Sequence, residues 1–342
     1  MKYIKKKLVK NKKYYYFNYT LSQVLNKKKI YLSKYIGIKI PDNIKDLMLD
    51  FFQKNIAQAS LQKISQSIRN YFSYNTNIYI EKNRFWYTCL LHKTFNKDFK
   101  LFKTLFYILF VLNSNRAEGS RVVRPDIEKV LQKRKVKPKT SIDKEIINSV
   151  EAINFAFSKK MQWNIKSIKT IHYKLFYNIA PNTAGQYKKE PNIAGDNIRG
   201  GIVSTTLPKD VPKEMRNLIN WFNQERKKKT YPPILALEFH WRFEAVHPFQ
   251  DGNGRVGRIL LNALLVENNF MPVIFFSKNH QSYCSAISKA RTGYSKKLAQ
   301  HFVEHLKKTK INIEKYEKEK VIKIASPQTE KWERARANTK IY

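Results

Sequence analysis

The sequence predicts a mainly α-helical protein, a helical bundle with one small β-hairpin and a helical extension at its N-terminus. Apolar residues recur at three- and four-residue spacing over most of the chain after Pro41. Residues 181–207 differ, because Pro, Gly and Asn separate short β-branched segments there, which is typical of a hairpin or an extended loop. No internal repeat of solenoid length and no long Gly/Ser linker interrupts the 342 residues.

The helices follow from this spacing in chain order. A first helical pattern starts near Pro41, where a proline and an acidic residue are typical of a first turn, and continues to residue 68. A run of apolar residues over 101–112 reads as a buried helix that ends at the polar cluster 113–115. Two helices are expected within 141–178, and further ones over 215–222, 234–246, 254–268 and 281–305.

The charge of the chain is extreme, but it does not identify a partner. The net charge is +40, from 66 basic and 26 acidic residues. Such a charge favours nucleic acid, an acidic surface or a polyphosphate ligand. However, Lys, Asn, Ile, Tyr and Phe are all abundant and share A/T-rich codons, and the lysines are spread along the whole chain. A dedicated nucleic-acid site concentrates charge on one face, so composition bias stays the simpler explanation.

The sequence favours a cytoplasmic protein. No run of apolar residues is long enough for a membrane helix. The lysine-rich N-terminus lacks the apolar segment and the cleavage site of a secretory signal. Only two cysteines occur, Cys89 and Cys284, without a partner motif, so we expect neither a disulfide framework nor a zinc site.

The segment from His247 to Arg258 gathers the parts of a phosphate site. Gly252-Asn253-Gly254 is a turn of small residues, and an apolar helical pattern starts directly after it. The turn therefore lies at a helix N-terminus, where free amide groups and the helix dipole bind anions.

Charged side chains surround this turn. Arg255 and Arg258 are three residues apart on one helical face and suit successive phosphates. Asp251 precedes the turn, where a carboxylate can hold Mg²⁺ against phosphate oxygens. His247 lies just upstream, and an imidazole changes charge near neutral pH, as a general base requires. Together these residues predict phosphoryl or nucleotidyl transfer.

This segment resembles the signature of the Fic family, His-Pro-Phe-x-Asp/Glu-Gly-Asn-Gly-Arg-x-x-Arg, at every fixed position. The resemblance implies a helical bundle that binds ATP and Mg²⁺ and transfers AMP to a Ser, Thr or Tyr hydroxyl of a target protein. It also implies a role for each residue. His247 is the base, Asp251 binds the metal, and Arg255 and Arg258 steady the outer phosphates. The anion hole is formed by Gly252, Asn253 and Gly254.

Ser114 to Gly119 is similar to the inhibitory motif of the same family, Ser/Thr-x-x-x-Glu-Gly/Asn. The resemblance implies that Glu118 pairs with Arg258 and removes this arginine from the γ-phosphate. A carboxylate competes directly with a phosphate for a guanidinium group. In some relatives the equivalent glutamate also serves removal of the modification, which stays open here.

The resemblance assigns two further features more loosely. Residues 181–207 correspond to the family's flap, a hairpin that docks the target chain, with Tyr187, Ile193 and Thr206 in flap positions; an ordinary surface hairpin is the alternative. Tyr283 is similar to a tyrosine that stacks near the adenine, and a packing role in the core is equally consistent. His240 is interpreted as a structural histidine rather than a metal ligand.

The resemblance divides the chain into four parts. Residues 1–95 form a Lys/Tyr-rich, mainly helical region of unknown role, 96–140 an inhibitory helix segment, 141–305 the Fic catalytic core and 306–342 a charged tail. Two alternatives stay open: the same fold with another nucleotide, phosphocholine transfer or removal of AMP, or a nucleic-acid-binding protein with a vestigial core. A homodimer and nucleic acid bound by the basic N-terminal region remain open as further partners.

Overall fold

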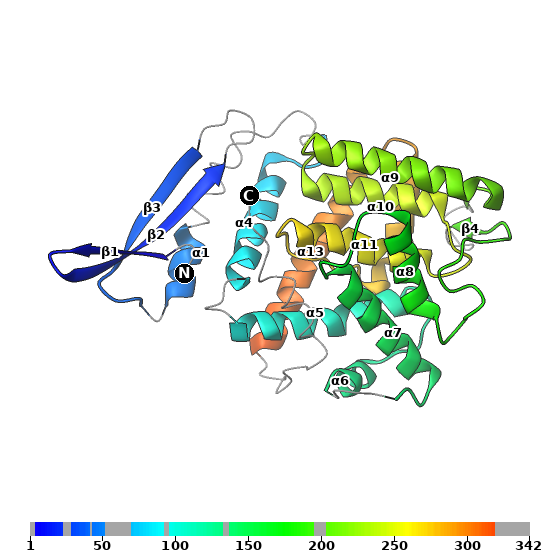
Figure 1. The fold of residues 1–342 in the computed structure, drawn as a ribbon, viewed down its shortest axis with the longest axis horizontal. Helices are drawn as coiled ribbons and strands as arrows, with labels where there is room; N and C mark the ends of the chain where they lie inside the picture. The colour runs from blue at the N-terminus through cyan, green and yellow to red at the C-terminus, as the bar shows by residue number, and fades with distance from the viewer. Residues whose placement is uncertain are drawn as a thin grey trace. The chain divides into compact units, whose positions relative to one another are not determined.

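A computed structural model of the chain describes residues 4–22, 29–41, 43–51, 70–91, 96–132, 137–194 and 203–318. These residues divide into two compact units. The first contains the residues up to Phe99 together with Asn269–Met271, and the second contains the others. Figure 1 shows the elements of both units.

The first unit contains a three-stranded antiparallel sheet. Its strands are β1 (Ile4–Val9), β2 (Lys12–Ser22) and β3 (Lys29–Gly37), with β2 in the centre. Lys10 and Asn11 connect β1 to β2 and both have positive φ, 46° and 60°, as tight hairpin turns require. The expectation of a mainly helical region is therefore wrong for residues 4–37. Tyrosines occupy both faces of β2, so the two-residue alternation that identifies a strand is hidden in the sequence.

Helix α1 (Ile44–Phe51) covers one face of this sheet. Phe17 of β2 is 1% exposed, and its ring stacks on Phe51 with 6.0 Å between centroids. Phe85 of α4 (Tyr74–Leu90) joins the same cluster. The helix predicted to start near Pro41 begins at Ile44, and its predicted continuation over 52–68 lies outside the described residues.

The second unit is a helical bundle, as predicted. Residues 281–305 form two helices instead of one, because Gly293 adopts a positive φ of 91° that ends the first. The predicted core boundary at 305 falls inside the last helix, where Thr309 and Ile313 are fully buried. The prediction of a charged tail is therefore wrong for residues 306–318, which continue this helix. Residues 319–342 lie outside the described residues. The helices are α5 (Asn96–Arg116), α6 (Arg124–Gln132), α7 (Ser141–Ala156), α8 (Ile165–Phe176), α9 (Val211–Lys227), α10 (Pro232–Val246), α11 (Asn253–Glu267), α12 (His280–Arg291) and α13 (Ser295–Lys318).

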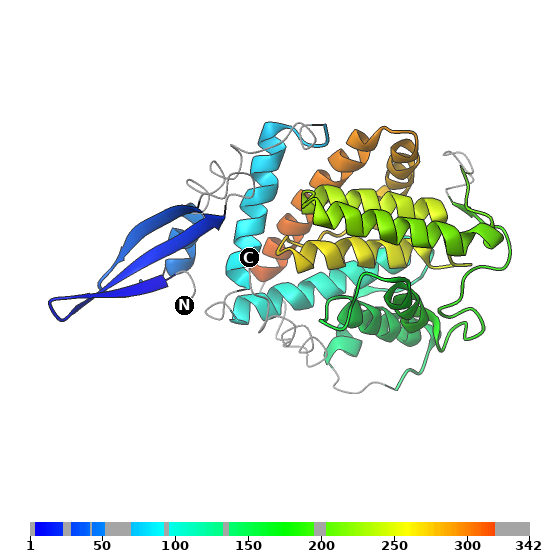
Figure 2. The same cartoon turned by 45° about the horizontal axis from the view of Figure 1, so that its top comes forward.

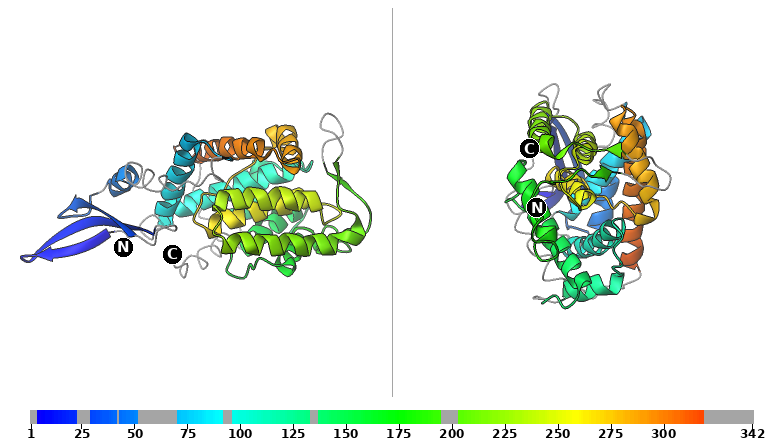
Figure 3. Two further views of the ribbon diagram at one scale, coloured as in Figure 1. Left: turned by 90° about the horizontal axis from the view of Figure 1, so that it is seen from above. Right: turned by 90° about the vertical axis from the view of Figure 1, so that its right-hand side faces the viewer.

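Helix α11 lies at the centre of this bundle. Its side chains from Val256 to Leu265 are buried, and it packs against α10, α7 and α8. Figures 2 and 3 show α9, α10 and α11 running side by side. A helix with so many buried residues is surrounded by protein, which fixes the N-terminus of α11 between its neighbours.

Two short strands stand apart from the helices. β4 (Ile193–Ala194) and β5 (Val203–Ser204) pair antiparallel, so the predicted hairpin is present, and Figure 3 shows them at one end of the bundle. The hairpin residues 195–202 lie outside the described part. Among the helices that the structure describes, none combines the length and the hydropathy that crossing a bilayer requires.

Candidate functional site

The site begins where α10 ends. His247 follows the last residue of this helix in the left-handed conformation, with φ 50° and ψ 59°. Its backbone N–H donates to the carbonyl of Phe243 at 2.9 Å, which closes the last helical turn. The chain therefore reverses at His247 and leads directly into the loop before α11. The imidazole is 16% exposed, so it is screened from solvent but accessible.

Asn253 fixes the conformation of this loop. Its side-chain amide donates to the Phe249 carbonyl at 2.8 Å, and its amide oxygen accepts from the Phe249 N–H at 2.9 Å. Phe249 is fully buried. Asn253 is itself 2% exposed, so its side chain serves the loop backbone. This contact ties the turn that follows His247 to the first residue of α11.

A second contact that holds the loop comes from His172 of α8, which the sequence analysis did not single out. Its ring stacks on Phe249 with 3.9 Å between centroids. Nδ1 accepts from the Gly185 N–H at 2.8 Å, so Nε2 bears the proton and donates to the Asp251 carbonyl at 3.1 Å. Burial lowers the pKa of His172 to about 4, which keeps the ring neutral. His172 thus positions the loop.

The N-terminus of α11 is open to an anion. Gly252 is its N-cap, with φ 76° and no side-chain cap, so the first amides of the helix keep free N–H groups. A Cβ at Gly252 would lie 2.4 Å from the Phe176 ring, which explains the glycine. Asp251 is 68% exposed; it accepts from the Gly252 N–H and lies 3.1 Å from Arg255.

The two arginines of the signature have different surroundings. Arg255 lies over the Phe176 ring, 4.6 Å from its centroid, and its side chain is 11% exposed. Arg258 is 2% exposed and forms a 2.7 Å ion pair with Glu118. It also donates to the hydroxyl and the carbonyl of Ser114, at 3.1 and 3.0 Å. The predicted pairing of Glu118 with Arg258 is therefore present.

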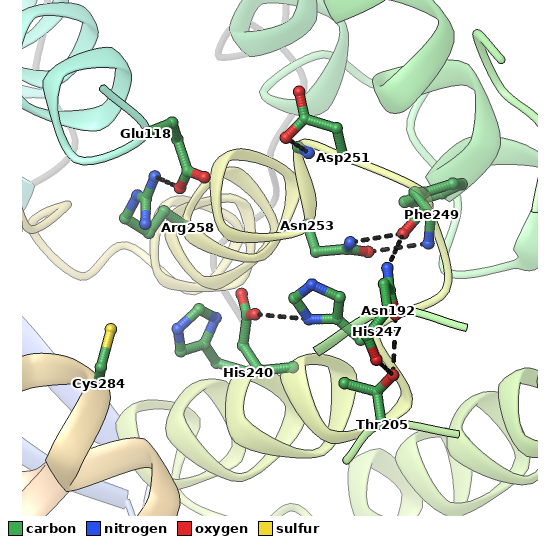
Figure 4. A network of polar contacts seen from close by, with 12 residues as sticks. Glu118, Asn192, Thr205, His240, His247, Phe249, Asp251, Asn253, Arg258 and Cys284 are labelled. Atoms are coloured by element: carbon green, nitrogen blue, oxygen red, sulfur yellow. Dashed lines mark hydrogen bonds and ion pairs between the residues drawn. The ribbon is translucent and has the colours of Figure 1, made fainter. Parts of the chain in front are cut away.

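This ion pair lies against the first turn of α11. A Cβ at Gly254 would be 2.4 Å from Glu118 Oε1 and 2.9 Å from Arg258 Nη1. Burial by itself would lower the pKa of Arg258, but the Glu118 carboxylate raises it above the usual range. Figure 4 shows Glu118, Arg258, Asp251, Asn253 and His247 around the same helix end. The predicted base, metal ligand, anion cradle and inhibitory glutamate thus lie together.

Glu244 is a member of the site that the motif does not specify. It lies one turn before His247, and its Oε2 is 3.6 Å from His247 Nδ1. Burial by itself would raise the pKa of Glu244, but its contact with His247 and the nearby charge of Arg258 lower it. Gly257 makes room for this carboxylate, because a Cβ there would be 2.5 Å from Glu244 Oε1.

Tyr283 lies in the core. Its side chain is 4% exposed, its hydroxyl hydrogen-bonds His240 Nε2, and its ring packs on Phe275 with 4.9 Å between centroids. This position favours the packing alternative over stacking on an adenine. His240 is completely buried, which agrees with a structural histidine, and burial lowers its pKa to about 4.

A buried lysine anchors the base of the β4–β5 hairpin. Lys188 Nζ donates to Asn192 Oδ1 at 2.6 Å and to Thr205 Oγ1 at 2.7 Å. The Asn192 amide donates to the Phe249 carbonyl at 2.8 Å, and the Lys188 N–H donates to the Pro248 carbonyl at 2.9 Å. Burial lowers the pKa of Lys188 to about 8. The hairpin is thereby attached to the loop that bears His247, and nothing in a lysine-rich sequence marks this one lysine.

The three residues assigned to the flap differ in position. Ile193 lies on β4 and is 49% exposed, and Thr206 follows β5 and is half-buried. Tyr187 precedes the hairpin, and its ring packs near Phe249 at 6.2 Å with Lys169 Nζ 3.9 Å above it. Tyr187 therefore supports the loop rather than the strands.

Asp251 suits Mg²⁺ as a single carboxylate ligand, with water and the substrate phosphates as the other ligands. The described residues contain no group of three or more His, Cys, Asp or Glu side chains suited to a metal ion. Mg²⁺ in nucleotide sites is held by one or two carboxylates, water and the phosphates of the substrate. An exposed carboxylate beside free helix amides is consistent with that mode.

Comparisons with known proteins agree on one family. Residues 162–265 match the family model described as Fic/DOC family. A Drosophila persimilis protein named protein adenylyltransferase Fic is 26% identical over 192 residues, which cover 55% of this chain and 37% of that protein. An Aquifex aeolicus protein named probable protein adenylyltransferase is 45% identical over 97 residues, 28% of this chain and 29% of that protein. The chain thus spans less than two fifths of these relatives.

Solved structures share the fold. A Fic domain containing signaling protein from Bacteroides thetaiotaomicron has a TM-score of 0.59 and 21% identity, and covers 71% of this chain and 99% of that one. Fic-1 from C. elegans has a TM-score of 0.57 and 21% identity, with 80% of each chain covered. Identities this low concern the fold alone.

Proposed function

We propose that this chain, whose residues 162–265 match the Fic/DOC family model, is a protein adenylyltransferase, which transfers AMP from ATP to a hydroxyl group of a target protein. The observation that carries the proposal is the convergence of His247, Asp251 and Arg258 on the open N-terminus of α11. Relatives named protein adenylyltransferase support the choice of AMP.

In the proposed reaction His247 accepts the proton of the target hydroxyl. The hydroxyl oxygen forms a bond to the α-phosphorus, the bond from that phosphorus to the bridging oxygen breaks, and pyrophosphate leaves. Glu244 faces Nδ1 at 3.6 Å, which favours the tautomer with a proton on Nδ1 and a lone pair on Nε2. His247 thereby presents Nε2 to the substrate. Contacts of this kind often shorten when substrate binds.

The phosphates are bound by the first turn of α11 and by Arg255. Free amides of that turn donate to phosphate oxygens, and the helix dipole favours the negative charge. Asp251 would bind Mg²⁺, which supplies neutralisation of the charge that develops on the phosphates. Arg255 contacts Asp251 at 3.1 Å before nucleotide binds, so it is already directed to the metal and phosphate side of the turn.

Glu118 would make the resting enzyme inactive. Arg258 is 2% exposed, and its Nε and Nη2 donate to Ser114 and Glu118, so these two donors are not available to a γ-phosphate. Release requires that Glu118 leaves, and its side chain is 23% exposed and follows the end of α5. A movement of the turn after α5 that bears Glu118 would therefore free Arg258 for a phosphate without changing α11.

The target chain would dock on the hairpin. β4 and β5 are only two residues long in the described part, and Ile193 is 49% exposed on one of them. An extended segment can add to such an edge through backbone hydrogen bonds. The network of Lys188, Asn192 and Thr205 would then hold the bound hydroxyl near His247.

The proposal is tested with purified protein, ATP labelled at the α-phosphate, Mg²⁺ and cell lysate. We expect the Glu118→Gly variant to label a lysate protein more strongly than the wild type does, and Glu118→Gly combined with His247→Ala to label none. Glu304→Gln is the matched control, because it removes a glutamate from an exposed pair with Lys308.

Two results would contradict the proposal. Labelling that persists without His247 would exclude its role as the base. Label transferred from the γ-phosphate, and none from the α-phosphate, would exclude adenylyl transfer in favour of another chemistry on the same fold. Mass spectrometry of the labelled band identifies the attached group and the modified residue.

A further inference from the structure

The sheet of the first unit has a face with lysines on β1 and tyrosines on β2 and β3. Antiparallel partners point to the same side of a sheet. Lys5 of β1 is opposite Tyr16 of β2, which is opposite Tyr35 of β3, and Lys7 is opposite Tyr14. We call these five residues the Lys/Tyr face.

This face is opposite the one that the core uses. Phe17 neighbours Tyr16 in sequence, points to the other side and is buried with Phe51 of α1. On the Lys/Tyr face, in contrast, Lys5 and Lys7 are exposed and Tyr35 is 50% exposed. Helix α1 therefore accounts for one side of the sheet and leaves the chemistry of the other side unexplained.

The tyrosine rings of the Lys/Tyr face form one platform. The Tyr16 and Tyr35 rings have centroids 5.3 Å apart, and the Tyr14 and Tyr35 rings 6.2 Å apart. Tyr31, on the same strand as Tyr35 and four residues before it, is 73% exposed and lies on the same face of the sheet. Adjacent exposed aromatic rings are the surface on which unpaired bases stack.

The charge of the sheet also favours a partner that combines unpaired bases with a negatively charged backbone. Residues 1–41 contain twelve lysines and no aspartate or glutamate. One lysine on the core side, Lys34, lies 3.6 Å from Asp50 of α1. Lys5 and Lys7 come from strands without any carboxylate, and their ammonium groups flank the tyrosine platform at the spacing of neighbouring strands. A negatively charged backbone would fit beside the rings.

We propose that the Lys/Tyr face binds single-stranded nucleic acid, with bases on the tyrosine rings and phosphates on the lysines. This goes beyond adenylyl transfer and does not depend on it. Bases in a duplex are already stacked on one another, so duplex gains only the charge interaction. A purely electrostatic partner would make no use of three adjoining tyrosine rings.

The test uses the full-length chain and a fluorescein-labelled single-stranded oligothymidine of about 20 nucleotides, a length that exceeds common site sizes. Binding is followed by fluorescence anisotropy over a series of salt concentrations. We expect Tyr16→Thr/Tyr35→Thr to weaken binding by about 10-fold or more, because stacking on each ring is lost. Threonine keeps the β-propensity of the strands, and circular dichroism checks the fold.

Charge is tested separately. Lys5→Gln/Lys7→Gln changes only exposed side chains, and we expect it to make the slope of log K against log salt shallower by about 1.4, since each single-strand phosphate contact contributes roughly 0.7. Tyr294→Thr/Lys296→Gln is the matched control, with an exposed tyrosine and an exposed lysine on the second unit. It should bind like the wild type.

Several results would overturn the proposal. The first is that the tyrosine variant binds the oligonucleotide with wild-type affinity. The second is that the control variant loses as much affinity as the tyrosine variant, and the third is that duplex binds as tightly as single strand. Stronger binding to vesicles of phosphatidylserine and phosphatidylcholine than to the oligonucleotide would assign the face to an anionic membrane instead. Because labelling of a target protein is a different readout, this result and the adenylyl-transfer result are distinguishable.

Discussion

Replacement of Glu118 should destabilise the protein and at the same time strengthen nucleotide binding. In Glu118→Gly the guanidinium of Arg258 stays buried and retains its two donations to Ser114 but has lost its carboxylate partner. Removing one partner of a fully buried pair costs about 3–5 kcal/mol. Glu118 is 23% exposed, so water can partly replace it, and we expect a loss of about 2–3 kcal/mol. The melting temperature should fall by roughly 4–12 °C.

The effect on nucleotide has the opposite sign. ATP must displace Glu118 from Arg258 before its outer phosphate can bind there. A hydrogen bond to a charged group is worth about 1.5–3 kcal/mol, which corresponds to a roughly 10- to 150-fold tighter Kd for ATP in the variant. Glu118→Gln keeps the shape and removes the charge, so it should lie between the wild type and Glu118→Gly.

Two measurements check this prediction. Differential scanning fluorimetry without ATP gives the loss of stability, and isothermal titration with ATP and Mg²⁺ gives the affinity. In saturating ATP the variant should gain more melting temperature than the wild type gains. Equal ATP affinity in the wild type and both variants would refute the competition between carboxylate and phosphate, even if the loss of stability were observed.

Three further predictions concern the loop and its supports. His172 and His240 have pKa values lowered to about 4 by burial, whereas an unfolded histidine titrates near 6.5. The unfolded chain therefore binds more protons between these values, and stability should fall by about 2–3 kcal/mol for each histidine as pH falls from 6.5 to 4, measured by urea unfolding; a flat profile would contradict it. Glu244→Gln should lower the labelling rate about 10-fold or more, since the carboxylate orients the imidazole of His247 from 3.6 Å; an unchanged rate would contradict this positioning role. Asp251→Asn should raise the Mg²⁺ concentration needed for half-maximal labelling by about 10-fold or more, and an unchanged requirement would exclude it as the ligand.

The sequence indicated most of the second unit correctly. The spacing of apolar residues located α7, α8, α9, α10 and α11, because helices that bury one face need that spacing. It failed for β1 to β3, where Tyr14, Tyr15 and Tyr16 give no alternation. A tyrosine is compatible with a buried face because of its ring and with an exposed face because of its hydroxyl. Consecutive tyrosines therefore do not indicate which side of the strand is buried.

The position of the turn between His247 and Arg258 could be predicted from the sequence alone, because its glycines and its charges lie within one short segment. Contacts between distant segments were decided by the tertiary structure. Arg258 and Glu118 are 140 residues apart, and their pairing was implied only by resemblance before the fold brought them together. The neutral His172 and the buried Lys188 had no signal in the sequence. Nothing distinguishes this histidine or this lysine from the others until the fold buries it, and burial then lowers its pKa.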